Sequence, residues 1–138
     1  MKVENRVRPG AENIQAFLAG KEEPVVMVNL LKFKEKAEYA DGRDTNLTGE
    51  EAYGRYAAEM RKLVEAAGGR FIFGGSVESL LLGEVEDLWD VIGLVEYPSP
   101  KSLLVIASSP EFAEIEKHRE AGLAGQLNLA VRAGGFAD

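Results

Sequence analysis

Residues 24–33 read PVVMVNLLKF, and this stretch decides the fold. It is a nearly continuous apolar run rich in β-branched residues, which is typical of a strand covered on both faces. A polar segment follows it from Glu35 to Leu47. We therefore predict a central strand over Val25–Phe33 and then a loop, which is long enough to have a function of its own.

The helices around this strand are marked by their ends. Thr48 and Glu51 have the spacing of a capping box, and Gly68-Gly69 ends the apolar stripe that follows. Ser-Pro pairs at 99–100 and 109–110 predict two further helix starts, because proline is favoured at the first helical position. The predicted helices cover residues 10–20, 48–67, 100–107 and 110–120.

Three more strands are predicted, from residue 71 to about residue 82, over 88–97 and over 127–132. With the first strand, and leaving the leading helix aside, the order is βαββαβ, the split βαβ or ferredoxin-like arrangement of the α+β class. In this arrangement a four-stranded antiparallel sheet has the strand order 4-1-3-2 and carries its helices on one face. The first and third strands are then central, and they are the most apolar strands of this sequence.

Length and composition narrow the possible partners. The chain has 138 residues, which predicts a single domain: a leading helical segment over 1–23, a core over 24–132 and a loose tail over 133–138. Its 16 basic and 23 acidic residues give a net charge of −7, which argues against nucleic acid and anionic membranes as partners. Without a signal peptide or an apolar segment of about 20 residues, we expect a cytoplasmic protein.

The first strand also predicts an assembly. Val26, Val28 and Leu30 alternate with the equally apolar Val25, Met27 and Leu31. Helices cover only one face of such a sheet, so a monomer would expose an apolar patch that soluble monomers seldom tolerate. We predict a homodimer in which the same face of a second copy covers this patch through a two-fold interface, sheet on sheet.

Several segments, in this order and spacing, resemble a bacterial family catalogued only as a domain of unknown function within the dimeric α+β barrel superfamily. The segments are Pro24–Phe33, Gly49–Tyr56, Gly68–Arg70, Trp89–Asp90, Glu96–Ser99 and Ser109–Phe112, with Arg119 downstream. The resemblance spans roughly residues 24–131 and implies a ferredoxin-like protomer in a dimer whose two sheets form a barrel. Relatives in that superfamily include cofactor-independent monooxygenases, lactone isomerases, haem-handling enzymes and stress-response proteins, so fold alone does not select an activity.

Asn29 is the most informative polar residue, because it lies inside the predicted central strand. An unpaired amide there would cost about 1–3 kcal/mol. Its side chain either bonds neighbouring backbone or a buried water, or it faces a ligand pocket between the sheet and the helices. The resemblance includes this Asn-Leu position and favours the pocket.

Trp89 and Asp90 are adjacent on a predicted strand, so they should point to opposite faces. Trp89 is expected in core or interface packing, with a ligand contact as the alternative. Asp90 needs a partner, because an unpaired buried carboxylate would become neutral. Its predicted partner is Arg70, Arg119 or Lys32, and the alternative is a general base.

Four helical residues complete the candidate set. Tyr53 and Tyr56 share the apolar stripe, either as core rings or as pocket-lining hydroxyls that bind or polarise a carbonyl. His118, the sole histidine, is either an exposed cation near a helix end or an acid–base catalyst. Arg119 fits the family pattern better than His118 does and is predicted to contact an anion or form a salt bridge.

With no cysteine and one histidine, we expect no metal, flavin or other cofactor, although a lone histidine could still serve as an axial haem ligand. Two function classes remain. The first is a small-molecule enzyme, such as a cofactor-independent monooxygenase or isomerase, with the loop over Glu35–Leu47 as a lid. The second is a non-catalytic ligand-binding or stress-related dimer. A site that gathers Asn29, Asp90, Arg119 and the tyrosines around a perturbed carboxylate would favour the enzyme.

Overall fold

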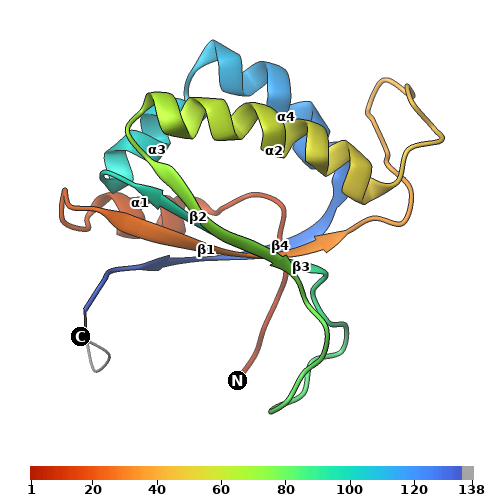
Figure 1. Ribbon diagram of the computed structural model, residues 1–138, viewed down its shortest axis with the longest axis horizontal. Helices are drawn as coiled ribbons and strands as arrows, with labels where there is room; N and C mark the ends of the chain where they lie inside the picture. Colours follow the sequence, from red (N-terminus) through yellow and green to blue (C-terminus); the bar gives the residue numbers. More distant parts are fainter. Residues whose placement is uncertain (135–138) are drawn as a thin grey trace.

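The computed structural model describes residues 1–134, and residues 135–138 of the predicted tail lie outside the described part. The chain forms eight helices and strands in the order helix, strand, helix, strand, strand, helix, helix, strand (Figure 1). They are α1 (Ala11–Leu18), β1 (Val25–Phe33), α2 (Gly49–Ala66), β2 (Arg70–Ser76), β3 (Val91–Tyr97), α3 (Pro100–Ala107), α4 (Pro110–Gly122) and β4 (Leu123–Val131).

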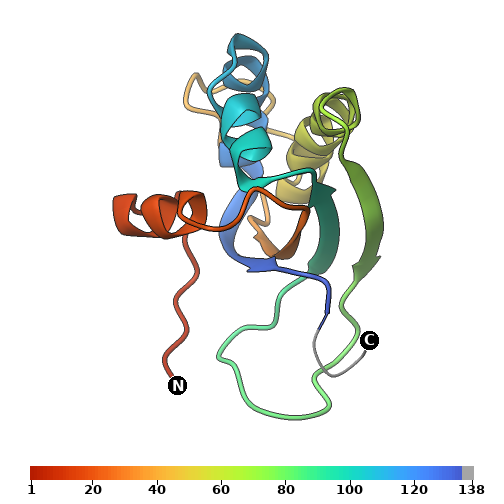
Figure 2. The ribbon, with the colours of Figure 1, turned by 90° about the vertical axis from the view of Figure 1, so that its left-hand side faces the viewer.

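The four strands form one antiparallel sheet in the order β2-β3-β1-β4. β1 and β3 are the central strands, which confirms the ferredoxin-like prediction. Figures 1 and 2 show α2, α3 and α4 on one side of the sheet, whereas α1 lies beside it. No helix within residues 1–134 covers the other face of the sheet.

The predicted helix caps are present. The Thr48 hydroxyl accepts a hydrogen bond from the backbone N–H of Glu51, and the Glu51 carboxylate accepts one from the N–H of Thr48, at 3.0 Å each. Ser99 and Ser109 cap α3 and α4 in the same way, each with proline at the first helical position. Within residues 1–134, no helix is both long and apolar enough to cross a membrane.

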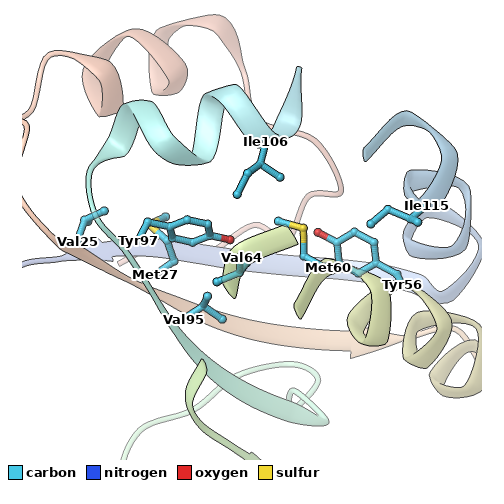
Figure 3. Packing of buried hydrophobic residues seen from close by; sticks show 9 residues of the cluster. All are labelled: Val25, Met27, Tyr56, Met60, Val64, Val95, Tyr97, Ile106 and Ile115. Carbon is cyan, nitrogen blue, oxygen red and sulfur yellow. The ribbon is translucent and has the colours of Figure 1, made fainter. Parts of the chain in front are cut away.

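The main hydrophobic core lies between the sheet and the helices (Figure 3). β1 contributes Val25 and Met27 to it, and Leu31 is buried on the same side of the strand. The remaining core residues come from α2, β3, α3 and α4: Tyr56, Met60, Val64, Val95, Tyr97, Ile106 and Ile115. Because side chains alternate along a strand, Asn29 shares the helix-facing side with Val25 and Met27.

Two predicted strand boundaries were wrong in the middle of the chain. β2 ends at Ser76 instead of continuing to Leu82, and β3 begins at Val91 instead of Leu88. Asp90 explains the second boundary, because its carboxylate accepts a hydrogen bond from the N–H of Phe33 at 2.9 Å, next to the last pair of the ladder. Residues 77–90 therefore form a long loop, and the expected opposite orientation of Trp89 and Asp90 on a strand does not apply.

The last strand was predicted too short. β4 begins at Leu123, four residues before the expected start at Leu127, and it pairs with β1 through a register shift near Lys32 and Phe33. The small residues Ala124 and Gly125 carry no strand signal in the sequence. Their pairing depends on β1, which lies far away along the chain.

Candidate functional site

Asn29 uses its whole side chain in hydrogen bonds to protein groups. Its Nδ2 donates to the carbonyl oxygens of Met27 at 3.3 Å and Gly93 at 3.2 Å. Its Oδ1 accepts from Gln126 Nε2 at 2.8 Å and also from Asn128 Nδ2. An amide side chain has two donor hydrogens and two acceptor lone pairs, so these four contacts satisfy it. The amide thus joins β1, β3 and β4 on the helix-facing side of the sheet.

Arg119 extends this polar chain towards α4. Its Nη2 donates to Gln126 Oε1 at 2.6 Å, and its Nη1 donates to the backbone oxygen of Val7 at 2.7 Å. Among residues 1–134, no carboxylate lies within ion-pair distance of this guanidinium, and only these two of its five N–H donors have protein partners. Arg119 is therefore a partly buried positive charge without a counter-ion.

Residues 5–8 lie over this end of the site, and we call them the N-terminal strap. The N–H of Arg6 donates to the backbone oxygen of Gln126 at 3.1 Å, which adds a short bridge to the edge strand β4. Asn5 Oδ1 accepts a hydrogen bond from the indole N–H of Trp89 at 2.7 Å, and Arg8 pairs with Glu120. Through Val7, the strap occupies one of the hydrogen bonds that Arg119 could give to a ligand.

An aromatic cluster lies next to Arg119 under α2. The rings of Tyr53 and Tyr56 have centroids 5.3 Å apart, and Tyr53 also packs on Phe33 at 5.4 Å. Phe112 of α4 meets Tyr56 edge-on at 6.1 Å. The hydroxyl groups of Tyr56 and Tyr97 point towards each other across the core (Figure 3). Such rings offer flat apolar surfaces together with hydroxyl donors.

The phenols of this cluster are held in their neutral form. Burial raises the pKa of Tyr53 well above its ordinary value, and the phenol of Tyr56 adds to the rise, while the charge of Arg119 opposes it. Burial likewise raises the pKa of Tyr56 to about 12, again opposed by Arg119. The pKa of Tyr97 is raised by burial and then by the phenols of Tyr56 and Tyr53. At neutral pH all three are therefore hydrogen-bond donors.

The hydroxyls of these three tyrosines have no protein hydrogen-bond partner in the described part of the chain. None of the hydrogen bonds formed within residues 1–134 involves the hydroxyl of Tyr53, Tyr56 or Tyr97. In the same part of the chain, no fully buried side-chain nitrogen or oxygen lacks a partner. Each phenol oxygen therefore retains some surface that a water molecule or a ligand can reach, since a sealed hydroxyl without a partner would be strongly unfavourable.

Asp90 and Trp89 lie apart from this cluster. Lys32 is the partner of Asp90, with 3.4 Å between Nζ and Oδ1, so the predicted ion pair is confirmed and Arg70 and Arg119 are excluded as the partner. The same ammonium lies 3.1 Å from Asp87, and these carboxylates raise the pKa of Lys32, with the Asp87 hydrogen bond as the main cause. Trp89 contacts the N-terminal strap.

His118 of α4 belongs to a different cluster, where it contacts Tyr39 on the loop between β1 and α2. Its Nδ1 and the hydroxyl of Tyr39 share a hydrogen bond of 2.7 Å, and Arg55 Nη1 lies 3.4 Å from the same hydroxyl. Burial lowers the pKa of His118, and the nearby charges of Arg55, Lys117 and Arg43 add to this, opposed by Asp44. The expectation of an exposed cation was wrong, because Tyr39 covers the imidazole and cations surround it.

Comparison with known proteins places the chain in a family. The domain of unknown function DUF1330 matches residues 43–132, which is more than half of the chain. The chain belongs to the DUF1330 family. The resemblance in the sequence is thereby confirmed, although the matched segment begins after β1 and so does not include Asn29. Tyr53, Tyr56 and Arg119 all lie inside it.

Solved structures agree with this DUF1330 assignment. The chain is similar to methylated RPA0582, at 30% identity and a TM-score of 0.87, over 97% of this chain and 98% of that one. A second structure of RPA0582, described as a protein of unknown function from Rhodopseudomonas palustris, gives 28% identity and 0.85 over 96% and 99%. Hydroxynitrile lyase from Passiflora edulis shares the fold at 13% identity and a TM-score of 0.56, over 83% and 99%. No curated protein matched the chain.

Gln126 of the polar chain and Tyr97 of the aromatic cluster were not identified from the sequence of this DUF1330 protein. Gln126 connects Arg119 to Asn29, and Tyr97 faces Tyr56, yet neither belongs to a recognisable motif. Alternation along β3 and β4 could have placed both on the helix-facing side. Within residues 1–134, no group of three or more histidine and carboxylate side chains is placed to hold a metal ion.

The lowered pKa of His118 leads to a prediction about pH. A native pKa below the unfolded value of about 6.5 means that unfolding takes up a proton, so stability falls as the pH decreases below about 6.5. Since this is the only histidine, its imidazole proton resonances can be followed by NMR, and we expect a midpoint below 6.5. Between pH 7.5 and pH 5.5, the melting temperature of His118→Gln should fall less than that of wild type. A midpoint at or above 6.5 would contradict the prediction.

Proposed function

We propose that the protein binds a small molecule with a carboxylate or a similar anionic group, between the sheet and the helices. The observation that carries the proposal is the guanidinium of Arg119, which is partly buried, has no carboxylate partner and keeps N–H donors free. The chain has a net charge of −7, and yet this guanidinium has no counter-ion. Together with the neutral tyrosine hydroxyls beside it, it is suited to bind an anionic ligand.

The aromatic cluster supports a flat or unsaturated ligand body. Tyr53, Tyr56 and Phe112 supply ring faces, and the hydroxyls of the two tyrosines are free to donate. Neutral phenols bind carboxylate and carbonyl oxygens well. Gln126, which Asn29 holds in place, orients the guanidinium. The chemistry of these groups suits a small aromatic or conjugated carboxylate.

A binding function is favoured over the monooxygenase or isomerase alternative. Such a reaction needs a group that accepts a proton, and the phenols of Tyr53 and Tyr56 have raised pKa values and so remain protonated. The two expected acid–base residues take part in other contacts, since Asp90 pairs with Lys32 and His118 bonds Tyr39. Neither expected acid–base residue therefore joins Arg119 and the tyrosines, as expected for a non-catalytic ligand-binding protein.

Arg119 provides the test of this function. Benzoate is a suitable probe and benzamide its uncharged counterpart, with binding measured by calorimetry. We expect wild-type protein to prefer benzoate, and Arg119→Ala to lose at least tenfold in affinity, because a hydrogen bond to a charged group contributes about 1.5–3 kcal/mol. Arg61→Ala, which removes an exposed arginine paired with Glu65 on α2, is the matched control. Equal binding of benzoate by Arg119→Ala and wild type would refute the proposal.

We also propose that two copies pack through their uncovered sheet faces. Directly paired residues of an antiparallel sheet share a face, so the register defines the members of this one. They are Val26, Val28 and Leu30 of β1, Phe73 of β2, Ile92 and Leu94 of β3, and Leu127, Leu129 and Val131 of β4. Phe73 is 60% exposed and Leu129 51% in the protomer, and a continuous apolar face of this kind supports association.

Leu129→Asp tests this interface. The side chain lies on the open face opposite Val28, so the substitution would place a carboxylate in the apolar contact of both copies. Wild-type protein is expected to sediment as a dimer at micromolar concentration, and the variant should dissociate at least tenfold more readily. Val105→Asp, at an exposed apolar residue of α3, should leave the dimer unchanged. A monomeric wild type would contradict the proposal.

A further inference from the structure

Residues 77–90, which we call the leucine arm, connect β2 to β3 and extend from the sheet on the side opposite the helices (Figures 1 and 2). Three consecutive leucines, Leu80 to Leu82, form its tip. Leu81 is fully exposed and Leu82 is 89% exposed, the largest exposures of any large apolar side chain after Met1 in residues 1–134. The arm and the open sheet face lie on the same side of the molecule.

The base of the arm is fixed to the sheet. The N–H of Asp90 donates to the backbone oxygen of Leu31 at 2.8 Å, and the N–H of Val77 donates to the backbone oxygen of Asp90 at 2.9 Å. Lys32 Nζ donates to the backbone oxygen of Leu88 at 3.0 Å and also pairs with Asp87 and Asp90. These contacts hold both ends of the arm, so its direction relative to the sheet is set by the fold.

The tip has no partner within the protomer. In the described part of the chain, residues 78–86 form no hydrogen bond or ion pair with any other residue. Three adjacent leucines held away from the core in this way form an exposed apolar surface that monomeric proteins rarely keep free. Because its base is held by hydrogen bonds and its exposed tip has no partner, the arm is suited to bind a partner.

We propose that the leucine arm clasps the second copy of this chain, so that the tip leucines of each protomer pack against the other beside its sheet. The proposal rests on the sheet-on-sheet dimer proposed above and adds a contact to it. The occupant is a second copy because the arm extends towards the side on which the open face receives that copy.

The area of the sheet supports this arrangement. A four-stranded sheet with two strands of seven residues and two of nine presents a flat face of roughly 500 Å², whereas a stable interface buries about 800 Å² on each partner. The open face alone is therefore small for a stable dimer. The exposed leucines of two arms enlarge the contact at its edge.

The reach of the arm supports the same occupant. The arm also carries the acidic residues Glu78, Glu84, Glu86 and Asp87, so in a chain of net charge −7 the uncharged leucines at 80–82 are the part of it that can approach a second copy. Leu81 lies four residues from Val77, a reach of up to about 13 Å in extended chain. Packed sheets lie about 10 Å apart, so the tip extends as far as the neighbouring layer.

The double variant Leu81→Asp/Leu82→Asp tests the arm by sedimentation, with circular dichroism to verify that the protomer is folded. We expect its dimer to dissociate at least tenfold more readily than wild type, while Val105→Asp behaves as wild type. A second measurement uses Leu81→Cys, the only thiol in a chain without cysteine, labelled with a polarity-sensitive dye. Its emission should shift to the red as dilution separates the copies.

The outcomes separate the arm from the dimer itself. If wild type dimerises, Leu129→Asp weakens the dimer and the double variant does not, the arm proposal is overturned and the sheet interface stands. Dye emission that is unchanged by dissociation would overturn the arm as well. A wild type that is monomeric throughout the concentration range would overturn both proposals.

Discussion

Gly122→Ala is expected to lower the free energy of unfolding by about 3 kcal/mol and the melting temperature by about 10 °C. A Cβ on Gly122 would lie 2.3 Å from the backbone oxygen of Gly49 and 2.9 Å from the backbone nitrogen of Tyr53. Both are backbone atoms, so the clash is relieved only by moving α2 away from α4. Gly49 is equally confined, since its Cβ would lie 2.1 Å from the backbone oxygen of Lys34.

Gly54→Ala is the matched control for this prediction. Gly54 lies in the interior of the same helix α2, and a Cβ there would meet nothing within 4 Å. Alanine is favoured over glycine in a helix by up to about 1 kcal/mol, so this variant should be at least as stable as wild type. Thermal unfolding followed by circular dichroism compares the two. Equal melting temperatures for both variants would show that the helices can separate freely at Gly122.

Asn29→Leu is expected to destabilise the fold by about 2–3 kcal/mol, which corresponds to several degrees in melting temperature. The substitution removes the oxygen that accepts hydrogen bonds from Gln126 and Asn128, and it leaves the backbone oxygen of Gly93 without its amide donor. These losses follow from a side chain whose four hydrogen bonds all go to protein groups. Arg119 should then bind benzoate more weakly, because Gln126, which orients its guanidinium, loses the Asn29 oxygen that anchors it.

Asn128→Ala serves as the control for Asn29. Asn128 is exposed on the edge strand β4, so water replaces its hydrogen bond and the loss should stay below about 1 kcal/mol. An Asn29→Leu variant with the melting temperature of wild type would reverse the interpretation. It would mean that the amide faces water or ligand, as the sequence analysis favoured, and that its protein contacts contribute little.

The main features of the fold were predictable because local signals agreed with one another. The apolar run Val25–Phe33 became β1 with the expected bounds, and the capping residues Thr48, Ser99 and Ser109 each start a helix. Errors arose where tertiary contacts decide the backbone. Asp90 ends a strand that its neighbours Leu88 and Trp89 would continue, because its carboxylate bonds the N–H of Phe33.

The candidate site was predictable in its residue types and less so in their grouping. Tyr53, Tyr56, Arg119 and Asn29 were expected on functional grounds, and they do lie on the helix-facing side of the sheet. Gln126 was missed because its importance comes from joining two residues that are distant in sequence. His118 and Asp90 were expected by chemistry alone, and their partners Tyr39 and Lys32 hold them elsewhere.

The N-terminal strap has a consequence for access to Arg119. Its residues 5–8 lie outside residues 43–132, the part that defines DUF1330 membership, and yet Val7 contacts Arg119 directly. Substitutions in the strap leave the hydrophobic core intact, since none of these residues belongs to it. Changes in residues 5–8 can therefore alter access to Arg119 without the cost in stability that changes in the sheet would bring.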